Sequence, residues 1–278
     1  MQHVTPMKLT ASIVLYNNHL HELDKAITSF TASSIPKKLY LIDNSAQKPQ
    51  LVTSSEVAVY IYNYSNLGFG SGHNIALSLS QEDNTPYHLV MNPDVYFDPT
   101  VLETLVQYMD DHPDVGLVMP KILYPDGTLQ HLCKLLPTPA DLIGRRFFPF
   151  LPWCKRRNEV YELRFADYDA IMSPPFLSGS FMLLRRQALK DVGHFDERFF
   201  LYMEDADLCR RIGTTYTTAY YPQAQIYHTY SKASYHRVHL MYEHVKSAIM
   251  YFNKWGWFKD QERDRINAEV LRSLKYAD

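Results

Sequence analysis

Short apolar runs alternate with amphipathic stretches through the first half of the chain. Continuous apolar runs predict strands inside a parallel sheet, since strands that are covered on both faces do not alternate between apolar and polar residues. Between the runs, residues 20–30 and 75–79 carry apolar side chains at helical spacing. This alternation predicts right-handed βαβ units, and hence an α/β fold with a mostly parallel sheet. The runs lie at residues 9–16, 39–42, 57–62 and 88–91.

The fourth run belongs to HLVMNPDVYFD, residues 88–98, which turns abruptly polar. Pro93 ends the predicted strand because it has no N–H to donate to a neighbouring strand. Apolar residues at helical spacing follow from Val101 onward, so we expect a helix directly after this segment. Asp94 would then lie between a strand end and a helix, where ligands bind in open α/β sheets. From its position alone, Asp94 is equally well a residue that caps a turn.

Polar clusters follow all four predicted strands. Because the carboxyl ends of parallel strands meet at one edge of a sheet, these clusters should gather at that edge. This coincidence is the main structural argument for a functional site. The clusters are Tyr16-Asn17, Asp43-Asn44-Ser45, the loop NYSNLGFGSGHN at residues 63–74, and Asn92-Pro93-Asp94.

The loop at residues 63–74 places Gly68, Gly70 and Gly72 before a predicted helix. Glycines there allow close backbone approach to a ligand and leave helix N–H groups free for an anion. The spacing differs from the GxGxxG dinucleotide fingerprint, and the acid, Asp43, comes before the glycines, so a Rossmann dehydrogenase is disfavoured. A plain glycine-rich turn stays open for the loop. Asp43 could bind a base or ribose, or form an Asx turn.

The second half of the chain does not continue the regular alternation of strands and helices. We predict a strand at residues 115–119, a hairpin in ILYPDGTLQ with its turn at Asp126-Gly127, and a strand at residues 181–184. A short helix at residues 187–192 should end at Gly193, and a long amphipathic helix should cover residues 238–252. The segment GRRFFPFLPWCKRR, residues 144–157, is interpreted as a loop because aromatics and prolines lie between two basic pairs.

Two adjacent acids, Glu204 and Asp205, begin a predicted helix that ends at Gly213. Apolar residues 199–203 precede them, and burial would raise a carboxylate pKa and suit it to general-base catalysis. The alternative is a favourable interaction of acids with the helix amino terminus. His228 follows an apolar pair at the end of a strand, where it is either a metal ligand or a structural histidine.

Composition narrows the classes of function. The chain has 28 Lys plus Arg against 30 Asp plus Glu, so overall charge gives no argument for binding nucleic acid. Cys133, Cys154 and Cys209 are widely spaced and contain no CxxC pair, which indicates reduced thiols and no structural zinc. The first ten residues do not look like a signal peptide, and no run of about 18 apolar residues occurs. We therefore expect a protein that is neither exported nor membrane-spanning.

Taken together, the motifs resemble a known family. NPDVYFD and FDERFFLYMEDADLCRR are specific in combination, whereas the glycine loop is not. With IVLYNN, LIDNS, NLGFGSGHN, LSGSFMLLRR and IYH, they are similar over residues 9–257 to the inverting nucleotide-sugar glycosyltransferases of family 2. The similarity is greatest to the bacterial rhamnosyltransferase branch. This resemblance implies a GT-A fold, a sugar nucleotide donor and a divalent cation, Mg²⁺ or Mn²⁺.

The resemblance also implies roles for single residues. Asp94 would be the metal-binding acid of the family's DxD element, Asp205 the catalytic base, and Asp43 the residue that holds the nucleotide base. His228 would be a metal ligand, and Glu204 would support the acceptor or the base. Asn92 stands where the DxD element has its first acid, so this site has one carboxylate fewer. Further expected sugar-nucleotide contacts are Tyr16, Asn17, Asn44, Asn66, Gly68 and Asn92, and expected acceptor contacts are Gly179, Ser180 and Glu204.

The expected function is transfer of a hexosyl group to a hydroxyl of a glycan or lipid-linked glycan in bacterial surface polysaccharide synthesis. Branch similarity favours an L-rhamnosyl group from dTDP-rhamnose. Three alternatives stay open: a transferase for UDP- or GDP-linked sugars, a nucleotidyltransferase, and a non-catalytic sugar- or nucleotide-binding module. We expect a transferase domain over residues 1–232, with a nucleotide half at 8–120 and an acceptor half at 121–232, and a C-terminal helical extension at 233–278.

A lipid-linked acceptor would require an enzyme without a membrane span to meet the bilayer. The aromatic and basic residues at 144–157 and around Trp255 and Trp257 suit a membrane interface. We therefore expect a cytoplasmic protein with peripheral contact to the inner face of the cytoplasmic membrane. The alternative is that the aromatics form a lid over the acceptor cleft and the arginines are solvated.

Overall fold

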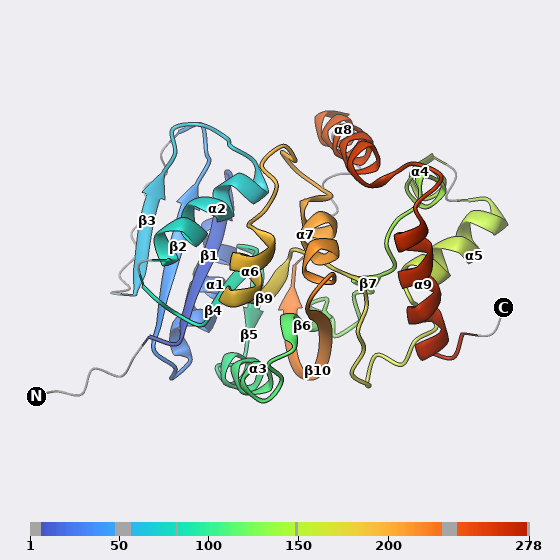
Figure 1. Cartoon of the computed structure of the whole chain (residues 1–278). Helices are drawn as coiled ribbons and strands as arrows, with labels where there is room; N and C mark the ends of the chain where they lie inside the picture. Colours follow the sequence, from blue (N-terminus) through green and yellow to red (C-terminus); the bar gives the residue numbers. More distant parts are fainter. Residues whose placement is uncertain (1–6, 48–56, 82, 148–149, 230–237, 277–278) are drawn as a thin grey trace, which may run out of the picture.

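The computed structural model is built around an eight-stranded sheet (Figure 1). It describes residues 7–47, 57–81, 83–147, 150–229 and 238–276. The strand order is β3-β2-β1-β4-β9-β6-β10-β5, and β7 and β8 form a separate two-stranded ribbon. The strands are β1 (Leu9–Leu15), β2 (Lys37–Asp43), β3 (Ala58–Tyr62), β4 (Tyr87–Met91), β5 (Val95–Phe97), β6 (Val115–Leu123), β7 (Cys133–Lys134), β8 (Phe176–Leu177), β9 (Phe181–Arg185) and β10 (Thr217–His228).

The first four strands confirm the predicted parallel sheet. β1 runs parallel to β2 and β4, and β2 runs parallel to β3. Ala11, Ser12 and Ile13 in β1 are all fully buried, so both faces of this strand are covered, as its unbroken apolar run predicts. α1 (Leu20–Ala32) packs against β5, and α2 (Phe69–Ser80) packs against β1. The polar clusters that follow the four strands therefore share one edge of the sheet.

The other half of the sheet has mixed direction. β9 lies antiparallel between β4 and β6, and β10 runs parallel to β6. The turn at Asp126-Gly127 is present, but the pairing beyond it is a single bridge between Leu123 and Leu129. α3 (Thr100–Asp111), α6 (Arg186–Val192) and α8 (Val238–Trp255) match predicted helices, and Gly193 ends α6 with φ +83°. All three cysteines are buried free thiols.

β5 is one of the short strands that were missing from the prediction. Asp94 is followed not directly by a helix but by β5, which is 3 residues long and pairs antiparallel with the end of β10. A strand this short cannot show the periodicity by which strands are recognised in a sequence. Its pairing sets His228 opposite Val95, so β5 is the element that brings His228 next to Asp94.

The prediction of a loop at residues 144–157 was wrong. The segment contributes to two helices, α4 (Pro139–Phe147) and α5 (Pro152–Tyr161). Pro139 and Pro152 stand in the first turns of these helices, where proline loses no hydrogen bond and has a suitable φ. The prolines therefore mark helix starts rather than irregular chain.

The C-terminal helices hold the helix that carries the two adjacent acids. α7 (Glu204–Ile212) contacts α8 through Asp207, whose buried carboxylate accepts hydrogen bonds from Trp255 Nε1 (2.8 Å) and Lys254 Nζ (2.7 Å). Arg210 makes a bidentate ion pair with Asp260 at 2.7 and 2.8 Å, just before α9 (Gln261–Ser273). Figure 1 shows α8 and α9 beside α7 and the α4–α5 pair, on the side away from β3.

We expect Arg210→Met to lower the free energy of unfolding by ~3–5 kcal/mol, because it leaves the buried Asp260 carboxylate without its cation. The side chains of Arg210 and Asp260 are only 2% and 4% exposed. Arg265→Met is the matched control, since its pair with Glu269 is exposed and should be worth less than ~1 kcal/mol. Urea unfolding measures both. Equal small losses would show that the Arg210 pair does not hold the C-terminal helices in place.

Candidate active site

The carboxyl ends of β1 and β2 form the first part of the site. Asp43 is fully buried and accepts hydrogen bonds from the Tyr60 hydroxyl (2.6 Å) and the Ser45 N–H (2.8 Å). The Ser45 contact is the Asx turn that the sequence left open. Ser45 Oγ accepts a hydrogen bond from the Asn17 N–H (2.9 Å), which ties the two strand ends together. Tyr16 lies beside this contact and is 49% exposed.

The glycine loop is fixed by packing. Gly68 has φ +87°, and a Cβ atom there would lie 2.2 Å from the Phe200 carbonyl oxygen. Asn44 Nδ2 donates a hydrogen bond to the Gly68 carbonyl, and Asn66 Oδ1 accepts one from the Gly68 N–H, both at 3.0 Å. The Phe69 N–H at the start of α2 donates to Phe200 O (2.9 Å). This N–H is therefore not free for an anion, and the plain glycine-rich turn describes this part of the loop.

Three predicted residues meet at the end of β4. His228 Nε2 lies 3.3 Å from Asp94 Oδ1 and 3.4 Å from Asn92 Nδ2. The Thr229 N–H also donates to the Asp94 carbonyl (3.0 Å), which holds the two chain segments together. A carboxylate and an imidazole nitrogen side by side are ligands that suit a transition-metal dication such as Mn²⁺.

The end of β4 is connected to the start of α7 through the residues before β9. The Asn92 N–H donates to Ser180 O (2.9 Å), and the neighbouring Gly179 N–H donates to Asp205 Oδ2 (3.0 Å). Asn92, two residues before Asp94, and the side chain of Asp205 are thus hydrogen-bonded to the adjacent residues Ser180 and Gly179. The structure brings together the residues that the sequence placed in separate motifs.

Asp205 and Glu204 have different surroundings. Both oxygens of Asp205 accept backbone N–H groups, from Gly179 and from Ala206 (2.9 Å). Burial raises the pKa of Asp205, while the nearby Lys134 charge and these N–H groups oppose the increase. Glu204 is buried, and its Oε2 has no hydrogen-bond partner among the described residues. Burial, and then the charge of Asp205, raise the pKa of Glu204 well above its ordinary value.

The backbone before α7 is strained. Tyr202 and Met203 both have positive φ, +71° and +67°, which costs energy for side chains of this size. Two consecutive left-handed residues turn the chain sharply just before Glu204. Such strain concentrates at functional sites, and here it sets the direction in which the two acids leave the turn.

Sequence reasoning missed Lys134. This residue lies in β7, with its Nζ 5.0 Å from the centre of the Phe176 ring. Burial, and then the charge of Arg145, lower its pKa to about 8, against the opposing effect of Asp205. No motif or spacing marks Lys134, because its proximity to Asp205 depends on the pairing of β7 with β8. It supplies positive charge near Asp205.

We expect Glu204→Gln to stabilise the protein, and to do so more at pH 8 than at pH 5. The folded pKa of Glu204 is raised, so between the unfolded and folded pKa values only the unfolded state releases the proton. Wild-type stability therefore falls with rising pH by up to ~1.4 kcal/mol per pH unit, and the glutamine variant lacks this loss. Thermal unfolding of both proteins across this range is the measurement. A pH-independent difference would contradict the raised pKa.

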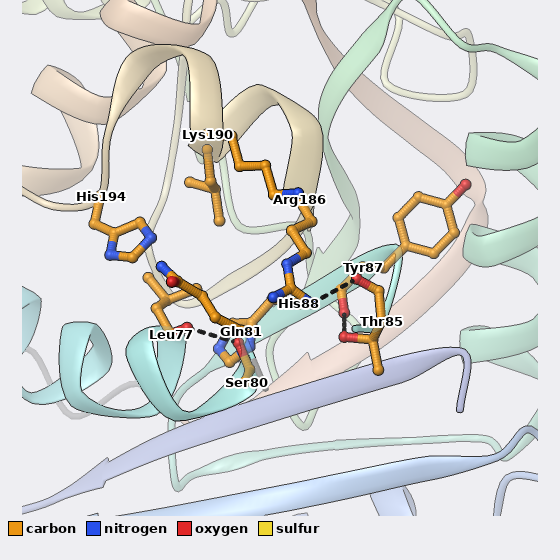
Figure 2. A pocket seen from close by; sticks show the side chains of 10 residues that line it. Leu77, Ser80, Gln81, Thr85, Tyr87, His88, Arg186, Lys190 and His194 are labelled. Atoms are coloured by element: carbon orange, nitrogen blue, oxygen red, sulfur yellow. Dashed lines mark hydrogen bonds between the residues drawn. The ribbon is translucent and has the colours of Figure 1, made fainter. Parts of the chain in front are cut away.

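A small pocket at the other edge of the sheet is excluded as the catalytic centre. It is lined near the start of β4 by His88, Arg186 and His194, and Figure 2 shows Lys190 close to them. None of its lining residues is acidic, so it offers no carboxylate for a cation. Burial, and then the charges of His194 and Arg186, lower the pKa of His88 to about 3, and its ring nitrogens are occupied by Thr10 and Ser12.

Comparisons with known proteins identify the family. The model of Glycosyl transferase family 2 matches residues 10–193. The chain is 29% identical over 226 residues to the N-acetylglucosaminyl-diphospho-decaprenol L-rhamnosyltransferase of Mycobacterium tuberculosis, covering 75% of this chain and 72% of the relative. It is 24% identical over 220 residues to rhamnosyltransferase WbbL of Escherichia coli, covering 72% and 76%.

A solved structure shares the fold. The crystal structure of GalNAc-T7 with UDP, GalNAc and Mn²⁺ matches with a TM-score of 0.60 at 14% identity, over 81% of this chain. This chain spans 43% of the GalNAc-T7 chain. The match confirms the expected GT-A architecture: a mostly parallel sheet covered by helices, here with additional C-terminal helices.

Proposed function

The chain belongs to glycosyl transferase family 2 and is a glycosyltransferase, and from that premise we propose that it transfers an L-rhamnosyl group, with inversion, from dTDP-rhamnose to an acceptor hydroxyl. The proposed acceptor is a lipid-linked diphospho-sugar of bacterial surface polysaccharide synthesis. The names of two relatives support the rhamnosyl group, and the name of the first, N-acetylglucosaminyl-diphospho-decaprenol L-rhamnosyltransferase, supports the acceptor.

One observation carries the proposal: Asn92, two residues before the acid that can hold a cation, and Asp205, the acid that can serve as base, hydrogen-bond to the adjacent residues Ser180 and Gly179. Asn92 N–H to Ser180 O and Gly179 N–H to Asp205 Oδ2 connect the two sides. A binding module needs no buried base opposite a cation site. A nucleotidyltransferase would need phosphate-binding Lys or Arg near the glycine loop, and residues 63–74 contain none.

The proposed reaction is a single displacement. Asp205 accepts the proton of the acceptor hydroxyl while the acceptor oxygen forms a bond to the anomeric carbon. The bond from that carbon to the donor phosphate breaks, and the nucleoside diphosphate leaves with the electron pair. The anomeric configuration inverts because attack and departure occur on opposite faces, and no covalent intermediate with the protein is needed. Gly179 and Ser180 would contact the acceptor, and Glu204 would support it.

The residues at the end of β4 fit the expected divalent cation. Asp94 and His228 would hold it, and the cation when bound would neutralise the charge that develops on the leaving diphosphate. The described residues contain no group of three or more His, Cys, Asp and Glu side chains that could hold a metal ion. Asn92 adds no carboxylate, so we propose that the donor diphosphate supplies further ligands, as is usual for Mg²⁺ in nucleotide sites.

We propose that the nucleotide lies across the ends of β1 and β2, in the half of the domain formed by residues 8–120. Its sugar-nucleotide contacts would be Tyr16, Asn17, Asp43, Asn44, Asn66, Gly68, Asn92 and Asp94. Asp43 already accepts two internal hydrogen bonds, so contact with the base would use a remaining lone pair of its carboxylate.

Release of nucleoside diphosphate from a panel of sugar nucleotides tests the function. dTDP-rhamnose, UDP-linked and GDP-linked hexoses are each supplied with and without a diphospho-lipid acceptor. The proposal expects acceptor-dependent release from dTDP-rhamnose and a product with inverted anomeric configuration by NMR. Preference for a UDP- or GDP-linked sugar would reassign the donor. Acceptor-dependent transfer with retained configuration would contradict the single displacement.

We expect the protein to bind anionic vesicles at low salt and to release them at high salt. No helix within the described residues is long and apolar enough to cross a bilayer. Phe150 and Trp153 beside α5 are 69% and 54% exposed, and Arg156 is exposed next to them; Phe148, from the same segment, lies outside the described residues. Each cation near an anionic surface contributes ~1 kcal/mol. Flotation of the wild type and of an Arg156→Ser/Lys155→Ser variant with anionic vesicles tests the membrane contact. A wild type that stays unbound at low salt contradicts it.

A further inference from the structure

A buried glutamine that no motif marks lies behind His228. Gln130 is 4% exposed and follows the turn at Asp126-Gly127, where its N–H donates to Ile122 O (2.9 Å). Its side-chain Nε2 donates to His228 O (2.8 Å) and approaches Leu123 O (3.3 Å). Both of these partners are carbonyl oxygens, which only accept hydrogen bonds. The amide group of Gln130 can therefore point in one direction only, with its Oε1 toward the His228 ring.

This orientation decides which ring nitrogen of His228 carries the proton. Gln130 Oε1 lies 3.0 Å from His228 Nδ1. An amide oxygen cannot donate, so Nδ1 must be the donor, and in the neutral ring the lone pair is on Nε2. Nε2 is the nitrogen that faces Asp94 and Asn92.

We propose that Gln130 is a positioning residue that holds His228 in the Nδ1–H form, so that the Nε2 lone pair is presented together with Asp94 to a divalent cation. The inference rests on the proposed cation-dependent transfer. Metal-binding histidines commonly donate their second ring N–H to such a partner, which fixes both the tautomer and the ring orientation. Because the partner here is a neutral amide, it adds no charge to a site that has only one carboxylate.

The test uses two variants of the same residue. Gln130→Met removes the acceptor and the donor, whereas Gln130→Glu keeps an acceptor for Nδ1–H and loses the donor to the two carbonyls. We expect Gln130→Met to weaken Mn²⁺ binding in the presence of dTDP by ~10- to 100-fold, measured by electron paramagnetic resonance. Gln130→Glu should stay within a few-fold of wild type. A purely structural role predicts that the two variants are equally impaired.

Nitrogen-15 NMR of the metal-free wild type at pH 8 reads the tautomer directly, with the His228 signals assigned from a His228→Asn variant. This measurement needs no folded Gln130 variant. A proton on Nε2, even if Mn²⁺ binds, overturns the role of Gln130 and leaves the cation-dependent function in place. Absence of Mn²⁺ binding by wild type with dTDP overturns both the cation-dependent function and the role of Gln130. A proton on Nδ1, together with weaker Mn²⁺ binding by Gln130→Met than by Gln130→Glu, supports the role of Gln130.

Discussion

We expect Asp205→Asn to lower turnover by ~10²-fold or more while donor affinity stays within a few-fold of wild type. Asparagine has nearly the same shape but cannot take a proton from the acceptor hydroxyl. It can also accept only one of the two backbone N–H groups, from Gly179 and Ala206, that the carboxylate accepts. Single-turnover assays with saturating dTDP-rhamnose, beside calorimetric titration of dTDP, separate the chemical step from binding.

Asp205 should also determine how turnover falls on the acid side of the pH–rate profile. Asp205 acts as base only when it is ionised, and burial raises its pKa above the ordinary aspartate value. Turnover should therefore fall as pH decreases through this raised pKa. Glu204→Gln is the control, because the two acids are adjacent and both buried. Loss of turnover in Glu204→Gln with an active Asp205→Asn would reverse their roles.

The parts of the fold that could be predicted are those whose residues carry a pattern within the element itself. β1, β2 and β4 each carry a continuous apolar run, because both faces of these strands are largely covered, and β3 carries one as a partly exposed edge strand. β5 and the helices α4 and α5 could not be predicted in this way. β5 has 3 residues and exists only because the end of β10 pairs with it. α4 and α5 begin at Pro139 and Pro152, and a proline at a helix start looks the same in a sequence as a proline in a loop.

The same distinction applies to the site. Asp94 and Asp205 stand in motifs that are specific in combination, and the structure connects Asn92 of the first motif and Asp205 of the second to the residues before β9. Gln130 stands in no motif, since it meets the His228 ring across 98 residues of sequence. Lys134 approaches Asp205 only through the β7–β8 ribbon. A residue whose role depends on such long-range pairing leaves no periodicity or spacing by which it could be found.

We expect Asp94→Ala to abolish the contribution of Mn²⁺ or Mg²⁺ to nucleotide binding, and to lower turnover by ~10²-fold or more, since charge stabilisation by a bound metal ion is worth several kcal/mol. In wild type, Mn²⁺ should tighten dTDP binding, because Asp94 and His228 would hold the cation and the cation would neutralise the diphosphate charge. In the variant His228 alone remains, and in chelator the two proteins should bind dTDP equally.

Asp98→Asn is the matched control for this effect. Asp98 follows in the same segment, but its carboxylate accepts hydrogen bonds from Thr100 at the start of α3 and lies away from His228. Calorimetric titration of dTDP with and without Mn²⁺ should therefore separate the variants: Asp98→Asn retains the Mn²⁺-dependent gain in affinity, and Asp94→Ala loses it. Wild-type turnover that persists undiminished in chelator would contradict the cation mechanism, because Asp94 would then have no metal ion to hold.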